Sequence, residues 1–181
     1  MKIHYISPYR SDKNIGKAIN DAIKNICPLD DDWIVHVDQD VCFLRPDSKA
    51  QIAEILSNTT FDVLGCMTNR LSSPHQLYKG KFSESADIRE HINIADQLHN
   101  SNYGVVNPTG INIAAMLMCF RVSTWQRTGG FREGSIRFDS EFTDSVQSLG
   151  GNLGIMAGVY VFHLYRMWSE RPIYAIEHLV K

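Results

Sequence analysis

The sequence predicts a single Rossmann-like α/β domain over residues 1–181, with a mixed, mostly parallel central sheet flanked by helices. Three observations support this prediction. The length of 181 residues is typical of one domain, and a hydrophobic content of 44% can fill its core. Short apolar runs alternate with segments of helical periodicity, which is the pattern of a sheet covered by helices on both faces.

The first half of the chain alternates strands and helices. The apolar run Ile3–Ile6 predicts a strand, which ends where Pro8 interrupts the pattern. Apolar residues at three- and four-residue spacing predict a helix over Lys13–Ile26 with one apolar face. We expect a second strand at Trp33–Val37 and a third at Phe61–Met67. Between them, a helix is expected from Asp47 or Ser48 to Leu56.

The second half begins with a polar segment, residues 71–110, that contains many turn residues. So long a segment in a small domain is more often a functional loop or lid than an idle connection. The spacing of Ile88, Ile92, Ala95 and Leu98 predicts one amphipathic helix inside it. The elements expected afterwards are a strand at Ile113–Phe120, helices near Val122–Arg127 and Asp139–Leu149, and a strand at Leu153–Val161.

The charge balance and the absence of targeting patterns limit the functional classes. The chain has 18 Lys and Arg and 20 Asp and Glu, which gives a formal net charge of -2. This balance argues against a dedicated nucleic-acid binder. It disfavours a nucleic acid as the acceptor but does not exclude one. The chain has no signal-peptide pattern, and its longest apolar run is about half of what a bilayer requires, so we expect a cytoplasmic protein without a membrane span. The four cysteines form no Cys-x-x-Cys pair, which favours reduced thiols.

Two carboxylates, Asp38 and Asp40, follow directly after the strand Trp33–Val37. Ligands of open α/β sheets bind outside the carboxyl ends of the strands, which is where this pair lies. Two carboxylates in a tight turn suit a hard cation such as Mg²⁺ or Mn²⁺. The alternative is a solvated acidic turn, because aspartate is common in turns.

Four ordered segments of the chain resemble the family 2 glycosyltransferases with the GT-A fold, in a minimal, short version. The first two are the stretch Asn14–Asn20, which opens a helix, and Asp38-Gln39-Asp40, the counterpart of the family's Asp-x-Asp motif. The others are Gly129-Gly130-Phe131, with Asp139 and Glu141 after it, and Tyr160–His163. The resemblance implies a metal-dependent, inverting transferase that moves a sugar from a nucleotide sugar, such as a UDP-sugar, to an unidentified acceptor hydroxyl.

The resemblance also implies roles for individual residues. Asp40 and His163 would bind Mn²⁺ or Mg²⁺, and Asp38 would contact the ion, its water or the ribose. Asp139 or Glu141 would be the catalytic base, with Asp144 as a further candidate, although acidic residues also commonly cap helices. The residues expected at the donor are Ser7, Pro8, Tyr9, Arg10, Asn14, Lys17, Asp38, Gln39, Gly129 and Gly130. Residues 71–110 would lie on the acceptor side.

Departures from the family pattern keep two alternatives open. Phe138 stands where the family has the first acid of a pair, which favours a sugar-nucleotide or glycan-binding module without turnover. A nucleotidyltransferase is less well supported, because Ser7–Ser11 is a poor phosphate loop. The family's usual strand between the first helix and the Asp-x-Asp motif is missing, which affects base recognition. Trp125 and Trp168 are expected to be apolar anchors first and stacking platforms for the acceptor second.

Overall fold

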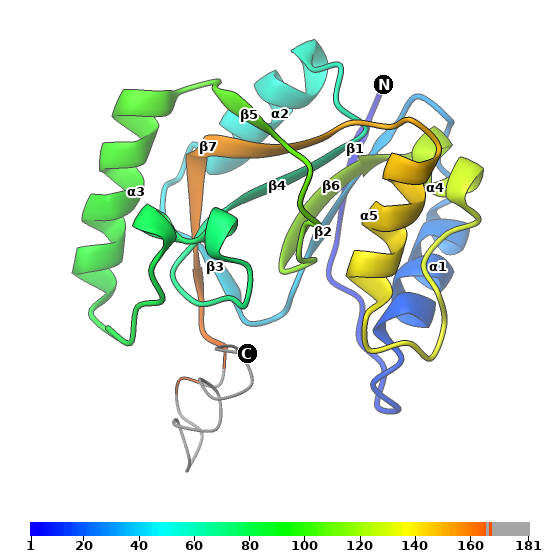
Figure 1. The fold of residues 1–181 in the computed structure, drawn as a ribbon, viewed down its shortest axis with the longest axis horizontal. Coiled ribbons are helices and arrows are strands. Elements are labelled where there is room, and N and C mark those ends of the chain that lie inside the picture. Colours follow the sequence, from blue (N-terminus) through cyan, green and yellow to red (C-terminus); the bar gives the residue numbers. More distant parts are fainter. Residues whose placement is uncertain (166, 168–181) are drawn as a thin grey trace.

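A seven-stranded sheet with helices on both sides forms the fold (Figure 1). The computed structural model describes residues 1–165 and residue 167. The strands are β1 (Ile3–Ile6), β2 (Trp33–Val37), β3 (Val41–Phe43), β4 (Val63–Thr68), β5 (Val106–Thr109), β6 (Leu117–Arg121) and β7 (Leu153–His163). Their order in the sheet is β1-β2-β6-β4-β7-β3, and β5 also pairs with β7.

The predicted α/β class and the mixed sheet are confirmed, but the sheet is less parallel than expected. Among the described residues the parallel pairs are β1–β2 and β4–β7. Strand β6 runs antiparallel to both of its neighbours, and β3 and β5 run antiparallel to β7. Hydrophobic patterning reports which residues are buried but not strand direction, and β3 and β5 were too short to show a pattern.

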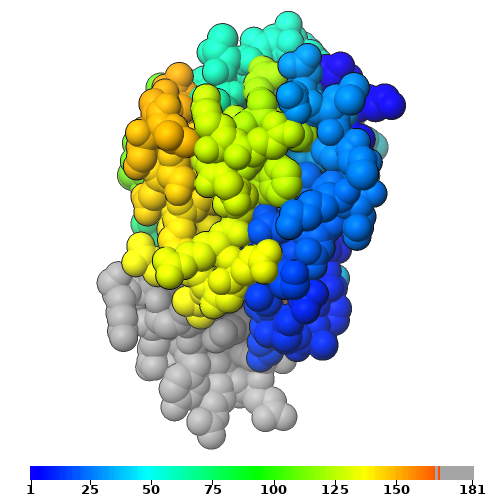
Figure 2. Space-filling model, turned by 90° about the vertical axis from the view of Figure 1, so that its right-hand side faces the viewer, coloured from blue at the N-terminus to red at the C-terminus, as the bar shows by residue number. Residues whose placement is uncertain are grey.

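Two apolar layers enclose the sheet. Helices α1 (Ile15–Ile26), α4 (Val122–Thr128) and α5 (Phe138–Ser148) cover one face and lie together on the side shown in Figure 2. Helix α2 (Ser48–Asn58) covers the other face. Alternate residues of β6 supply the two layers, because successive strand side chains point to opposite faces: Met118 and Phe120 face the α1–α5 side, and Leu117 and Cys119 face α2.

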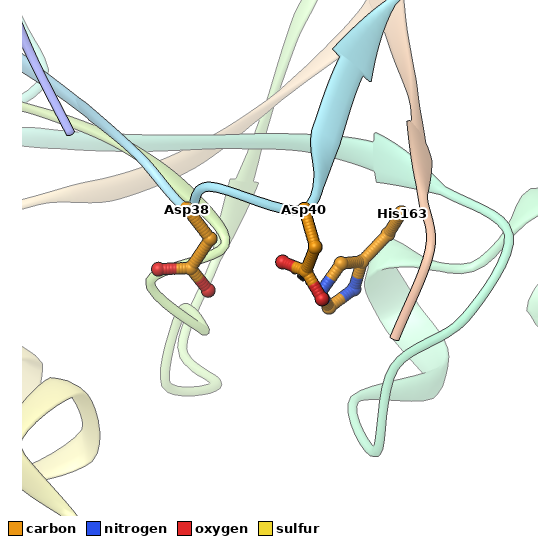
Figure 3. Close-up of side chains that lie close together, drawn as sticks. All are labelled: Asp38, Asp40 and His163. Atoms are coloured by element: carbon orange, nitrogen blue, oxygen red, sulfur yellow. Dashed lines mark ion pairs between the residues drawn. The ribbon is translucent and has the colours of Figure 1, made fainter. Parts of the chain in front are cut away.

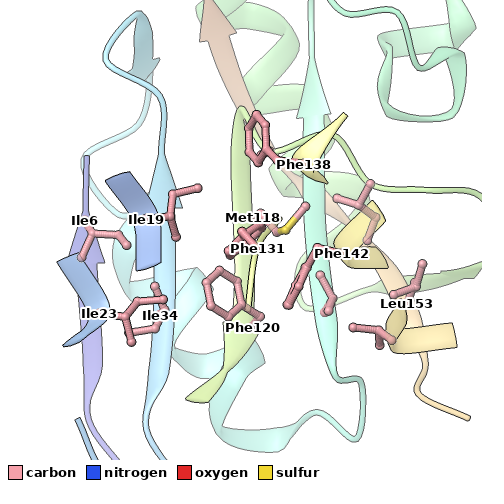
Figure 4. Packing of buried hydrophobic residues seen from close by; sticks show 14 of the residues in the cluster. Ile6, Ile19, Ile23, Ile34, Met118, Phe120, Phe131, Phe138, Phe142 and Leu153 are labelled. Atoms are coloured by element: carbon pink, nitrogen blue, oxygen red, sulfur yellow. The ribbon is translucent and has the colours of Figure 1, made fainter. Parts of the chain in front are cut away.

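The core on the α1–α5 side is built around aromatic rings (Figure 4). Phe131 and Phe142 stack with their ring centroids 4.3 Å apart, and Phe120 meets Phe142 edge to face at 5.3 Å. Ile19 and Ile23 of α1 are fully buried on the same side. This packing fixes α5, and with it Asp139, against the sheet.

The segment 71–110 is ordered around its predicted helix, which is confirmed as α3 (Ile88–Asn102). Two short 3₁₀ turns precede it, η1 (Pro74–Gln76) and η2 (Tyr78–Gly80), and β5 follows it. The buried ring of His91 ties α3 to β7 through a 2.8 Å hydrogen bond between its Nδ1 and the Tyr160 hydroxyl. The role of this segment as a lid stays a prediction.

Strand β7 changes register against β4 halfway along its length. Cys66 lies opposite Met156, but the next residue, Met67, lies opposite Tyr160. The irregularity coincides with a sharp bend of β7 in Figure 1. Beyond the bend the strand continues to His163 and pairs with β3, so the bend carries the end of β7 toward the turn after β2.

No helix in the described part of the chain is long and apolar enough to cross a membrane. All four cysteines are free thiols, of which Cys66 and Cys119 are buried and Cys27 and Cys42 are exposed.

Candidate active site

Asp38, Asp40 and His163 come together because β3 folds back onto β7. Strand β2 ends at Val37, and a turn follows in which the Val41 amide donates to the Asp38 carbonyl at 3.2 Å. Val41 then pairs with His163, and the Leu164 amide donates to the Asp40 carbonyl at 2.8 Å. The backbone therefore holds the acidic turn beside the end of β7 (Figure 3).

The three side chains form a compact cluster of potential metal ligands. One ligand atom from each lies within 4.8 Å of the others, and His163 Nε2 is 3.3 Å from Asp40 Oδ1. The buried His163 ring places its Nδ1 2.7 Å from the carbonyl oxygen of Arg70. Because a carbonyl can only accept, Nδ1 carries a proton, and the other ring nitrogen, Nε2, faces the cluster, where it can donate to Asp40 when protonated or offer a lone pair to a cation when not.

Neighbouring groups keep the two aspartates ready to bind a cation. Burial raises the pKa of Asp40, but the hydrogen bond and charge of His163 outweigh burial and bring it below its ordinary value. Asp38 Oδ1 lies 3.1 Å from Nε2 of the buried His36, which orients this carboxylate. Two carboxylates and one imidazole are a donor set that fits Mn²⁺, and the carboxylates also suit Mg²⁺.

A cavity of about 350 Å³ connects this cluster with Asp139. Asp38 and His163 line it together with Asp139, and apolar side chains including Met116 and Phe138 complete the wall. The Asp139 carboxylate is held by the amide of Ser140 at 2.7 Å and, across the cavity wall, by the amide of Ala115 at 3.3 Å. Burial raises the pKa of Asp139 above its ordinary value, against the effect of these hydrogen bonds.

The other two candidate bases lie in a different hollow. Glu141 and Asp144 line a cavity of about 430 Å³ with Gly129 and Gly130. One Glu141 oxygen is 3.5 Å from the guanidinium of Arg132. The structure thus brings Asp139, and neither Glu141 nor Asp144, to the cavity that contains Asp38 and His163.

The residues Ser7 to Arg10 lie at the same edge of the sheet as the acidic turn. Parallel pairing places Ile6 opposite His36, so the segments that follow β1 and β2 leave the sheet side by side. Tyr9 is 73% exposed and Gln39 is also exposed, and both are open to a ligand. Arg10 is bound within the chain, to Asp12 at 2.8 Å and to Asp21 at 3.5 Å.

Asn14 and Lys17 also have partners inside the chain. The Asn14 side chain caps α1 by accepting from the Lys17 amide at 3.1 Å, and it accepts from the Gly134 amide at 2.9 Å. The Lys17 ammonium lies 3.3 Å from Asp21 and 3.7 Å from Glu133. Both residues are therefore engaged in holding the loop 132–137 against α1.

The glycine pair has a structural explanation. Gly129 ends α4 and Gly130 follows it, with φ values of 80° and 84° that favour glycine. A Cβ atom at Gly130 would lie 2.8 Å from Asn20 Oδ1 and 2.9 Å from Trp125 Nε1. Trp125 donates to Asn20 at 2.9 Å and packs on the core, as expected of an anchor. Trp168 lies outside the described residues.

Three residues that support the site were not singled out from the sequence. His36 stands two positions before Asp38, a spacing that puts both side chains on one face of an extended chain and so could have indicated the contact. Asn69 accepts from the His163 amide at 2.8 Å and donates to the His163 carbonyl at 3.3 Å. Neither Asn69 nor Arg70 gave a signal in the sequence, because their partner is distant in the chain.

No model of a known protein family, no curated protein and no solved structure matches this chain at a significant level.

Proposed function

We propose that this protein is a metal-dependent, inverting glycosyltransferase that moves a sugar from a nucleotide sugar, such as a UDP-sugar, to an acceptor hydroxyl. One observation carries the proposal: a single cavity is lined by Asp38 and His163 of the acidic cluster and by a separate half-buried carboxylate, Asp139. A transferase of this kind needs both features, a cation site for the diphosphate and a base for the acceptor. The proposal includes a cytoplasmic location.

Asp40, His163 and Asp38 are the residues that would hold Mn²⁺ or Mg²⁺. When bound, the ion would supply positive charge that stabilises the departing diphosphate. The hydrogen bond from His163 Nδ1 to the Arg70 carbonyl keeps Nε2 directed at the cluster, where a cation would replace any proton on this nitrogen. The low pKa of Asp40 keeps its carboxylate charged at neutral pH, so no proton competes for this ligand.

Asp139 is the residue best placed to act as the base. The acceptor hydroxyl would transfer its proton to the Asp139 carboxylate as its oxygen attacks the anomeric carbon. The bond between that carbon and the diphosphate oxygen breaks, and the electron pair leaves with the diphosphate. Attack opposite the leaving group inverts the anomeric configuration. The raised pKa makes this carboxylate a stronger base than an ordinary surface aspartate.

Donor hydrolysis and binding test this function. The protein is incubated with Mn²⁺ and a panel of nucleotide sugars, and release of the nucleoside diphosphate is measured beside calorimetric binding of UDP. We expect hydrolysis of at least one donor, its loss in Asp139→Asn with UDP binding retained, and full activity in the matched variant Glu141→Gln. Binding of UDP without hydrolysis of any donor would support the binding-module alternative. Absence of both would refute a role in nucleotide-sugar chemistry.

A further inference from the structure

Arg70 carries a positive charge that no carboxylate contacts directly in the described part of the chain. The residue is only 2% exposed, and no carboxylate of the described residues forms an ion pair with it. Its Nε atom is buried and has no hydrogen-bond partner within residues 1–165. Its guanidinium rests on the ring of Phe82, with 4.8 Å between the guanidinium carbon and the ring centroid.

A buried arginine without an anion is unfavourable. A guanidinium stays protonated in proteins, so it cannot escape burial by losing its charge as a lysine can. Burial lowers the pKa of Arg70, and the negative charge of Glu84, which forms no ion pair with it, raises this pKa in part. Contact with an aromatic face compensates only part of the lost hydration. Among the described residues Arg70 is therefore a buried cation without an ion pair, which an anionic ligand would satisfy.

Arg70 lies in the wall between two hollows. The residues after it in the chain, Leu71 and Ser72, line the cavity of the candidate active site. Asn69 before it and Phe82 beneath its guanidinium line a second hollow of about 320 Å³. The Arg70 carbonyl already contacts His163, and the segment that follows β4 passes beside this histidine in Figure 3.

The other cations considered for a phosphate are already neutralised. Arg10 is paired with Asp12 and Asp21, and Lys17 is paired with Asp21 and Glu133. No lysine or arginine is among the described residues that line the active-site cavity. Arg137 also adjoins this lining without an ion pair among the described residues, but its side chain is exposed, so Arg70 is the buried cation of the two.

We propose that Arg70 binds a phosphate group of the substrate, and that its guanidinium turns from Phe82 into the active-site cavity to do so. The proposal rests on the proposed function, and it identifies the residue that would contact the departing diphosphate. The planar guanidinium can donate two parallel hydrogen bonds to phosphate oxygens, which an ammonium group cannot reproduce. Asp38, Asp40 and Asp139 would repel the same phosphate, so a cation that enters the cavity would also offset their charge.

Calorimetric titration with UDP and with uridine, both in the presence of Mn²⁺, separates phosphate recognition from base recognition. For Arg70→Gln we expect UDP to bind about 10- to 100-fold more weakly, the loss typical of a charged hydrogen bond. Uridine binding and Mn²⁺ binding should be unchanged. Arg70→Lys should lie between Arg70→Gln and the wild type. The matched control is Arg89→Gln, which removes a largely exposed arginine of α3 that pairs with Asp87.

Each outcome bears on the proposal. If the wild type binds UDP more tightly than uridine and Arg70→Gln does so equally well, Arg70 has no role in phosphate binding and the proposed function still stands. If Arg70→Gln loses Mn²⁺ binding as well, the residue is structural and the proposal is overturned. If the wild type does not distinguish UDP from uridine, the proposed function fails and the role of Arg70 fails with it. A thermal melt of each variant verifies that it is folded.

Discussion

Replacement of Asp40 by asparagine tests the metal site with little disturbance of the fold. The Asp40 carboxylate lies 3.3 Å from His163 Nε2 and within 4.8 Å of an Asp38 oxygen. Two like charges at that distance repel by about 1 kcal/mol in water, which is the appropriate limit for a side chain that is 44% exposed. Without metal, the free energy of unfolding of Asp40→Asn should therefore stay within about 1 kcal/mol of the wild type.

With Mn²⁺ the two proteins should differ clearly. Loss of a residue that merely supports a ligand costs about 10- to 100-fold in affinity, so loss of a charged ligand should cost at least about 100-fold. Mn²⁺ at 100 times the wild-type dissociation constant stabilises the wild type by about 2.7 kcal/mol. The same concentration would stabilise Asp40→Asn by only about 0.4 kcal/mol.

Thermal melting with and without Mn²⁺ measures this difference. For a chain of this size the expected rise in Tm is about 5 to 10 °C for the wild type and about 1 °C for the variant. Asp31→Asn is the matched control, because it removes an exposed carboxylate from the turn at the opposite end of β2. An equal rise in Tm for the wild type and Asp40→Asn would refute Asp40 as a ligand.

Burial raises the pKa of Asp139, so the folded state binds the proton of this carboxyl more tightly than the unfolded state does, and stability falls as pH rises through this pKa. At pH 7, Asp139→Asn should therefore melt at a higher temperature than the wild type. The same variant should abolish donor hydrolysis, and the rate of hydrolysis by the wild type should rise with pH over the same range. Hydrogen bonds from His4 and from backbone amides lower the pKa of Asp32 to about 2. The charged Asp32 carboxylate therefore stabilises the fold at pH 5, and this stabilisation is lost as pH falls toward 2. In an acid titration followed by circular dichroism, Asp32→Asn should lose less stability over this range than the wild type. In urea titrations, Gly130→Ala should lower the free energy of unfolding by about 2 kcal/mol or more, because the alanine adds strain at positive φ and its Cβ clashes with Asn20. Gly134 also has a positive φ, but a Cβ there meets no atom, so Gly134→Ala should cost only about 1 kcal/mol.

The sequence was sufficient for the elements that carry a strong hydrophobic period. Helix α1 begins and ends close to the predicted bounds, and α3 was visible inside a polar segment from four apolar residues. Strand β6 is shorter than the predicted run and begins at Leu117, since the buried residues before it belong to a loop. Burial alone does not distinguish a strand from a buried loop, so such bounds cannot be obtained from apolar content.

The sequence was sufficient to show that Asp139 and Glu141 cannot both face one site. Successive side chains of a helix are rotated by about 100° around its axis, so side chains two positions apart point to nearly opposite sides of the helix. Asp139 and Glu141 of α5 therefore cannot face one cavity, and the structure places them in two. The pairing of Arg10 and Lys17 with Asp21 was not obtainable in this way, because it also depends on how the loop before α1 folds back.

The position of His163 depends on the irregularity in β7. Relative to β4, the strand contains three extra residues, Ala157, Gly158 and Val159, between the partners of Cys66 and Met67. An odd shift of register moves every later side chain to the other face of the sheet. Without the irregularity, the turn after β2 would meet a different residue of β7, and the imidazole would not complete the cluster.

The surroundings of Gly158 show why this irregularity persists. A Cβ atom there would overlap the carbonyl oxygen of Asn102 and would lie 2.7 Å from the Gln51 side chain, so the bend of β7 packs directly against the end of α3 and against α2. Beyond it, the Asn69 side chain bonds both the amide and the carbonyl of His163. The cluster is thus held by packing on the covered face and by side-chain hydrogen bonds at its edge. Because these contacts exist in the free protein, the ligand atoms are already close together before any cation binds, which reduces the ordering that binding would require.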